Sequence, residues 1–145
     1  MTDNAAGMTM HASCVAWGEA GVLIKGASGC GKSALALTLM AYGCQLVADD
    51  QVRLERRGDG IIASCPPTIT GLIEARGVGL LHADMAPPTL IVLVVDLETD
   101  ETSRLPERHS YSCLGCALPL INRISGAHFA PAILQYLKAG RSHDR

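Results

Sequence analysis

The sequence has few aromatic residues and no excess of positive charge. Phe, Trp and Tyr make up 3% of its 145 residues, and the formal net charge at pH 7 is −2. Proteins that bind nucleic acid need a basic surface, and those that bind single strands also stack bases on aromatic side chains. Nucleic acid is therefore not an expected partner, and an anionic membrane surface is disfavoured for the same electrostatic reason.

Long hydrophobic runs are also lacking. No apolar run approaches the length needed to cross a membrane, and the first residues, Met1-Thr2-Asp3-Asn4, lack the basic start of a signal peptide. We therefore expect no membrane partner and a cytoplasmic location. Hydrophobic residues make up 48% and charged residues 18%, so the length predicts a single globular domain over residues 1–145.

The six cysteines form no complete metal-binding pattern. Cys113-Leu114-Gly115-Cys116 is a single C-x-x-C, and His109 would bring the nearby ligands to three, whereas structural zinc takes four. We expect this segment to be a flexible loop.

The strongest positive signal is a glycine-rich stretch at residues 26–33. It fits the pattern G-x-x-x-x-G-K-[ST] of the phosphate-binding P-loop, with Gly26, Ala27, Ser28, Gly29, Cys30, Gly31, Lys32 and Ser33. An apolar run predicts a strand before it, and residues 34–42 predict a helix after it. In such a junction, backbone N–H groups hold phosphate oxygens, the lysine reaches the β/γ-phosphates and the serine hydroxyl binds Mg²⁺. The stretch therefore predicts a nucleotide site.

The rest of the pattern predicts an α/β fold, with a mixed sheet and few helices. We expect extended chain at residues 8–17, strands at 22–25, 45–48 and 90–95, a hairpin from 51–55 and 61–65, and a closing helix at 130–139. Residues 100–116 are polar and predict irregular chain.

Two acidic strand ends compete for the catalytic role that phosphoryl transfer requires. Val94-Val95-Asp96 has the form of a Walker B element, and Val47-Ala48-Asp49-Asp50 has the same form with two adjacent carboxylates. Neighbouring residues on a strand point to opposite faces, so one carboxylate of the pair can act as base while the other assists the metal. The residues alone leave the choice between the two strand ends open.

Five motifs occur along the chain in a fixed order. They are His11, the loop at residues 26–33, Leu46-Val47-Ala48-Asp49-Asp50, Pro66-Pro67 and Glu74-Ala75-Arg76-Gly77-Val78-Gly79. This series resembles the catalytic domain of HPr kinase/phosphorylase, in the short form found in alphaproteobacteria, over about residues 8–96. The resemblance favours the strand end at Asp49 and Asp50 over Asp96, which the family's motifs do not require.

The resemblance implies a fold, an activity and a set of roles. The fold is the single P-loop domain of the HPr kinase and phosphoenolpyruvate carboxykinase type. The activity is transfer of the γ-phosphoryl group of ATP, with Mg²⁺, to a serine of the phosphocarrier protein HPr, in a homo-oligomer that is a hexamer in the family. The roles fall on the matching residues: Asp49 as the base, His11 and Lys32 beside the transferred phosphate, and Ser33, Asp50 and Glu74 at the metal.

The sequence also departs from the family. Ala75 replaces the usual isoleucine of the Glu-x-Arg-Gly segment, and only Arg123 stands near the family's later loop, P-[VI]-[KR]-x-G-R-N, which is linked to dephosphorylation. The resemblance therefore implies the kinase more directly than the reverse phosphorolysis. Two other classes stay open: a P-loop small-molecule kinase that uses Asp96 as its Walker B acid, and a regulatory nucleotide-binding module that transfers nothing.

Overall fold

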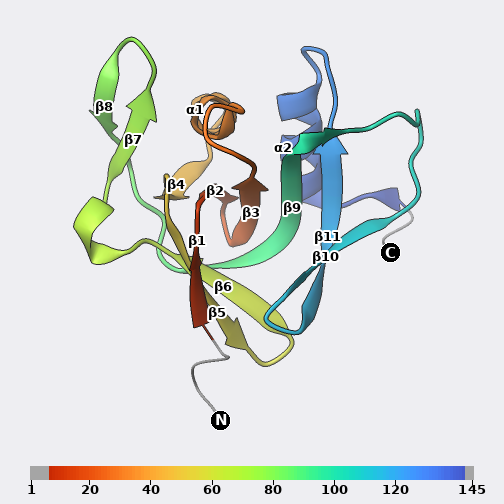
Figure 1. Ribbon diagram of the computed structural model, residues 1–145, viewed down its shortest axis with the longest axis horizontal. Helices are drawn as coiled ribbons and strands as arrows, with labels where there is room; N and C mark the ends of the chain where they lie inside the picture. Colours follow the sequence, from red (N-terminus) through yellow and green to blue (C-terminus); the bar gives the residue numbers. More distant parts are fainter. Residues whose placement is uncertain (1–6, 143–145) are drawn as a thin grey trace.

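The computed structural model describes residues 7–142, which form one large mixed sheet, a separate two-stranded hairpin and two α-helices (Figure 1). The elements are β1 (Gly7–Met10), β2 (Ala12–Trp17), β3 (Ala20–Lys25), α1 (Lys32–Ala41), β4 (Gln45–Ala48), β5 (Val52–Arg57), β6 (Gly60–Ser64), a 3₁₀ turn (Pro67–Ile69), β7 (Leu72–Ala75), β8 (Gly79–His82), β9 (Thr89–Asp100), β10 (His109–Cys113), β11 (Cys116–Arg123) and α2 (Phe129–Ala139).

The sheet is organised around β9, its longest strand. The strand order is β1-β5-β6-β9-β3-β2-β4, and β11, which carries β10, also pairs with β9. The first residues of β9 pair with β6 in antiparallel fashion, and its later residues pair with β11 in parallel. Since β9 also pairs in parallel with β3, it joins both halves of the sheet.

Four strands end at one edge of the sheet. β3, β9 and β11 run in parallel. β2 is antiparallel to both β3 and β4, so β4 runs in the same direction as β3. The carboxyl ends of β3, β4, β9 and β11 therefore meet at the edge where β2 begins, and such an edge is where open α/β sheets bind ligands.

Apolar residues fill both faces of this sheet. On one face, Val22 and Ile24 of β3 pack with Leu39 of α1 and Ile133 of α2. On the other face, Leu23 packs with a second cluster that includes Leu54, and both clusters consist largely of residues with almost no exposed surface. The alternation along β3 fixes which face each helix covers, because successive side chains of a strand point to opposite faces.

The expected mixed α/β fold is confirmed, and most boundaries fall close to the prediction. The extended stretch at residues 8–17 is two strands, because β1 pairs with β5 whereas β2 pairs with β3 and β4, and His11 lies at the break. The strand expected at residues 90–95 is longer, and Leu90 is exposed rather than buried.

The prediction of irregular chain at residues 100–116 is confirmed for residues 101–108 and is wrong for the rest of the segment. β9 continues to Asp100, and β10 and β11 form a hairpin that turns at Leu114 and Gly115, both with positive φ (49° and 82°). Such a turn matches the twist of a hairpin. The C-x-x-C is thus a tight turn between paired strands, and within residues 7–142 no group of three or more His, Cys, Asp or Glu side chains could hold a metal ion by itself.

Neither helix of the described residues combines the length and the apolar character that a membrane crossing requires.

Candidate active site

The glycine-rich loop connects the end of β3 to the start of α1. Gly31 precedes the helix with φ 100°, a left-handed conformation that suits glycine, and an added Cβ at Gly26 would lie 2.5 Å from the Cys30 sulfur. The loop can therefore close tightly only with glycine at these positions. It leaves free N–H groups at the start of α1, where the helix dipole favours an anion.

Lys32 lies inside the bend of this loop. Its side chain is 7% exposed, and Nζ donates hydrogen bonds to the carbonyl oxygens of Gly26 and Ala27, at 2.8 and 2.9 Å. The loop's own backbone therefore holds the ammonium group, which places a positive charge where phosphate oxygens would lie.

Asp49 follows β4 directly and is almost fully buried, with 6% of its surface exposed. Its Oδ1 accepts hydrogen bonds from the hydroxyls of Ser13, at 2.6 Å, and Ser33, at 2.7 Å. Its Oδ2 accepts from the backbone N–H of Glu74, at 3.1 Å. One carboxylate thus links β2, α1 and β7 through neutral donors.

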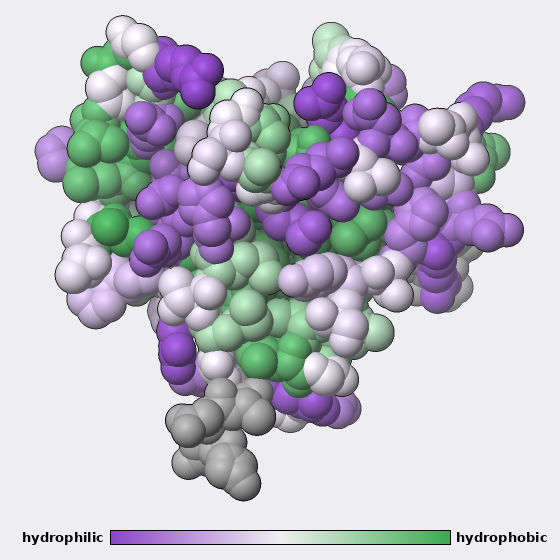
Figure 2. Space-filling view, viewed as in Figure 1, coloured by the Kyte–Doolittle hydropathy of each residue, from purple (hydrophilic) through white to green (hydrophobic). Residues whose placement is uncertain are grey.

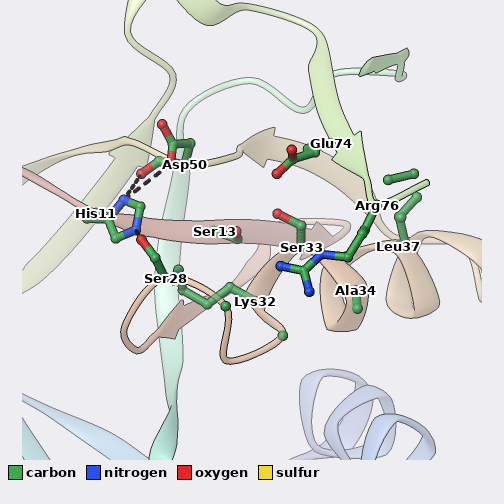
Figure 3. A pocket seen from close by; sticks show the side chains of 13 residues that line it. His11, Ser13, Ser28, Lys32, Ser33, Ala34, Leu37, Asp50, Glu74 and Arg76 are labelled. Carbon is green, nitrogen blue, oxygen red and sulfur yellow. Dashed lines mark hydrogen bonds and ion pairs between the residues drawn. The ribbon is translucent and has the colours of Figure 1, made fainter. Parts of the chain in front are cut away.

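Asp50 points to the other side and is exposed. His11 Nδ1 lies 2.9 Å from the Asp50 carbonyl oxygen and 3.2 Å from its Oδ1 (Figure 3). Since both Asp50 oxygens are acceptors, Nδ1 carries the proton of the neutral imidazole. Nε2 then accepts a hydrogen bond from the Ser28 hydroxyl, at 3.1 Å. His11 therefore connects the exposed carboxylate to the glycine-rich loop.

The hairpin of β7 and β8 brings Glu74, the last residue of the predicted set, together with Arg76, which has no predicted role. Glu74 and Arg76 line the same cavity as the loop, from the opposite side, and Figure 3 shows Arg76 extending over the start of α1 beside Ser33. The cavity has a volume of about 470 Å³ and is lined by His11, Ser13, Ser28, Gly29, Gly31, Lys32, Ser33, Ala34, Leu37, Asp50, Glu74, Ala75 and Arg76. Residues separated by more than sixty positions thus form one site.

The oxygen donors around this cavity suit Mg²⁺. A buried carboxylate with only neutral donors lies next to the Ser33 hydroxyl, and the Glu74 and Asp50 side chains face the same space. Magnesium commonly uses one or two protein ligands and takes its remaining oxygens from phosphates and water, so it needs no complete cage of side chains. The residues present fit the ion.

Asp96 lies outside this cavity. Its carboxylate is 3.6 Å from Lys25 Nζ and accepts hydrogen bonds from the backbone N–H of Glu98 and the hydroxyl of Thr99, at 2.9 and 3.1 Å. Its carboxylate bonds to residues of its own strand, so the geometry favours Asp49 and Asp50 as the acidic pair.

Comparison with known families agrees with this geometry. The family model for the HPr serine kinase C-terminal domain matches residues 3–113. The chain belongs to this family. The recognition drawn from the five motifs is confirmed.

Curated relatives of this HPr serine kinase domain are named HPr kinase/phosphorylase. One from Bordetella pertussis is 55% identical over 62 residues, which cover 42% of this chain and 20% of the relative. One from Exiguobacterium sibiricum is 48% identical over 73 residues, covering 50% and 24%. Another from an Exiguobacterium species is 37% identical over 107 residues, covering 68% and 34%. The chain therefore matches only about a third or less of the length of these relatives.

A solved structure shares the fold. The HPr(Ser) kinase/phosphatase of Coxiella burnetii superposes with a TM-score of 0.74 at 25% sequence identity, covering 90% of this chain and 88% of that chain. The likeness covers a larger share of the chain than the family-model match, which ends at residue 113.

Proposed function

We propose that this domain transfers the γ-phosphoryl group of ATP to a serine hydroxyl of HPr. The observation that carries the proposal is the cavity at the glycine-rich loop, which is lined by the buried Lys32, by Ser33 and by Asp50, with the buried Asp49 bonded to the Ser33 hydroxyl. Family membership and the relatives' names support the substrate. Phosphoryl transfer needs mainly positioning and charge stabilisation, which this arrangement can supply.

We further propose that Asp50, rather than Asp49, accepts the proton of the incoming hydroxyl. Asp49 is buried and already accepts three hydrogen bonds, so little of its carboxylate is open to a substrate hydroxyl. Asp50 is exposed at the mouth of the cavity, and His11 holds it. This division reverses the roles that the resemblance implied for the two aspartates.

The other residues divide the remaining tasks. Asp49 orients the Ser33 hydroxyl, and Ser33 with Glu74 would hold Mg²⁺, which neutralises phosphate charge when bound. Lys32 exchanges its two carbonyl partners for phosphate oxygens. His11 fixes the orientation of Asp50 and, once protonated, stabilises the charge near the transferred group.

We place the protein substrate against the β7–β8 hairpin. Val78 is 74% exposed and Leu80 is 68% exposed, on the hairpin whose first strand carries Glu74 into the cavity. Figure 2 shows apolar surface over the region that this hairpin occupies in Figure 1. Because the patch continues from the mouth of the catalytic cavity, a protein that presents a serine there would also cover it.

The experiment is incubation of the purified chain with labelled ATP, Mg²⁺ and HPr, followed by phosphoamino-acid analysis. We expect phosphoserine, and a loss of rate of about 10²- to 10⁴-fold in Asp50→Asn. Asn accepts the same left-handed backbone, so this variant should stay folded. Transfer in Asp50→Asn at the parent rate would overturn the assignment of the base, whereas no transfer by the unaltered chain would overturn the kinase.

Two finer points are tested in the same system. Adding inorganic phosphate to pre-phosphorylated HPr shows whether the reverse reaction occurs, and light scattering shows whether the chain forms the hexamer that the resemblance implies.

A further inference from the structure

A second cavity lies on the other side of the glycine-rich loop. It has a volume of about 500 Å³ and is lined by Cys30, Gly31, Leu35, Thr38, Leu97, Arg123, Ile124, Ser125, Gly126, Ala127, Phe129 and Ala130. These residues come from the loop, from α1, from β9 and from the end of β11 through the start of α2. The cavity therefore opens at the same sheet edge as the catalytic one, beyond β9 and β11 rather than beyond β4.

The two cavities share Gly31 and differ in chemistry. The first contains the acids and the histidine. The second has walls of Leu35, Leu97 and Phe129, and its only charged lining residue is Arg123, which is exposed and lies 3.3 Å from Asp100. A hollow of this size that combines apolar side chains with polar groups is typical of small-molecule sites.

We propose that this second cavity receives the nucleoside of the nucleotide whose terminal phosphate lies in the first. The inference rests on the proposed kinase. The transferred phosphorus must face Asp50 and His11, so the triphosphate runs along the loop away from them and its nucleoside emerges past Gly31. There the apolar faces of the base would pack against Leu35 and Phe129, and the ribose would meet the polar rim at Ser125 and Arg123.

A different exit exists on the first cavity, beside Ala34, Leu37 and Arg76. A nucleoside there would lie under the β7–β8 hairpin, in the opening that a protein substrate needs to bring its serine to Asp50. Separate cavities let nucleotide and protein bind together, which direct transfer requires. The geometry therefore favours the second cavity.

The test compares a nucleotide with an inorganic chain of the same charge. Ala127 is exposed on the wall of the second cavity, and Ala127→Trp would fill the space without replacing any residue of the glycine-rich loop at 26–33. By titration calorimetry with Mg²⁺, we expect this variant to bind ATP at least about tenfold more weakly than the parent, and tripolyphosphate within about twofold of it. Ala132 is exposed on α2 and does not line the cavity, so Ala132→Trp is the matched control. It should change neither the affinity for ATP nor that for tripolyphosphate.

Each other outcome overturns either the nucleoside inference alone or the proposed function together with it. Unchanged ATP affinity in Ala127→Trp, or a selective loss of ATP affinity in Leu37→Trp instead, would place the nucleoside elsewhere and overturn the inference while leaving the kinase intact. If the unaltered chain binds tripolyphosphate but gains nothing from the nucleoside, the inference also fails. If it binds neither ligand, the proposed function fails with it. Should Ala127→Trp not fold, Ser125→Trp, at another exposed position of the same wall, replaces it.

Discussion

Asp49 joins three segments that are distant in sequence. Its carboxylate accepts hydrogen bonds from Ser13, Ser33 and Glu74, so the loop helix and the β7–β8 hairpin are both held to the centre of the sheet through one side chain. The residue therefore helps to hold the elements that line the cavity in place.

Asp49→Asn should lower the free energy of unfolding by about 1–3 kcal/mol, because a buried, charge-assisted acceptor is lost and one donor is left without its partner. Urea denaturation followed by circular dichroism measures this change. Asp50→Asn, at an exposed position, is the control and should change stability far less. Equal effects of the two substitutions would contradict the division of roles between the aspartates.

The place of both aspartates near the glycine-rich loop could be predicted from the sequence, but the directions of their side chains could not. The sequence predicts both on a strand, where adjacent side chains point in opposite directions, whereas in the structure β4 ends at Ala48 and both aspartates follow it. Which direction leads into the protein depends on the pairing of β4 with β2, and on the positive φ (72°) of Asp50, which turns the chain out of the strand. Neither feature is written in the local sequence.

At the scale of elements, the β7–β8 hairpin is separate from the main sheet but contributes to the catalytic cavity. It carries Glu74 and Arg76 into the cavity, yet all four residues of β8 are exposed. Exposed apolar side chains at such a place are expected to serve binding rather than folding.

Leu80→Ser should raise the KM for HPr by about fivefold or more, while ATP affinity and stability stay near those of the parent. Steady-state kinetics with varied HPr measure the effect. Leu105→Ser provides the control: Leu105 is 82% exposed, on the loop between β9 and β10, which Figure 1 shows on the opposite side of the molecule. If both variants behave like the parent, the substrate docks elsewhere.

The loop between β9 and β10 is organised by one carboxylate. Glu101 accepts hydrogen bonds from the backbone N–H groups of Thr102 and Ser103, and it lies 2.9 Å from His109 Nε2. The backbone bond from Ser103, followed by the bond from His109, holds the pKa of Glu101 below its ordinary value of 4.5.

This lowered pKa predicts the sign of a pH effect. A carboxyl group with a depressed pKa in the folded state stabilises the protein above its ordinary pKa, and the benefit is lost as pH falls through the folded-state pKa. Glu101→Gln should therefore lower the melting temperature at pH 7, with a difference from the parent that shrinks below about pH 4.5. Thermal melts from pH 3 to 7 test this, and a pH-independent difference would contradict it.

The β10–β11 hairpin shows where prediction from sequence failed. Its inward residues alternate regularly, as Tyr111, Cys113, Cys116, Leu118 and Leu120, with polar or small residues between them. This alternation of period two was present in the sequence. The polar composition and the C-x-x-C pattern obscured it, because Leu114, a residue unusual in a left-handed turn, stands at the turn.

At the scale of the whole molecule, nucleotide binding should stabilise the fold. Saturation at about one hundred times Kd adds roughly 2.7 kcal/mol to the free energy of unfolding, so MgATP should raise the melting temperature. Lys32→Met should lose most of the rise, because the charge inside the loop is gone. Removing Mg²⁺ with a chelator should reduce the rise in melting temperature of the parent. An equal rise without the ion would argue against a magnesium site at the oxygen donors around Ser33.

The two cavities proposed to hold the nucleotide use partly different stretches of the chain. The catalytic cavity is built from residues 11–76, inside the segment that the family model matches, whereas Arg123 to Ala130 of the second cavity lie beyond the end of that match. Residues 123–130 can therefore differ among relatives without a change in any residue that lines the catalytic cavity. Among relatives, we expect the preferred nucleobase to vary while the transfer chemistry stays the same. Exchanging residues 123–130 between two relatives should therefore change the nucleotide preference and leave the transfer reaction unchanged.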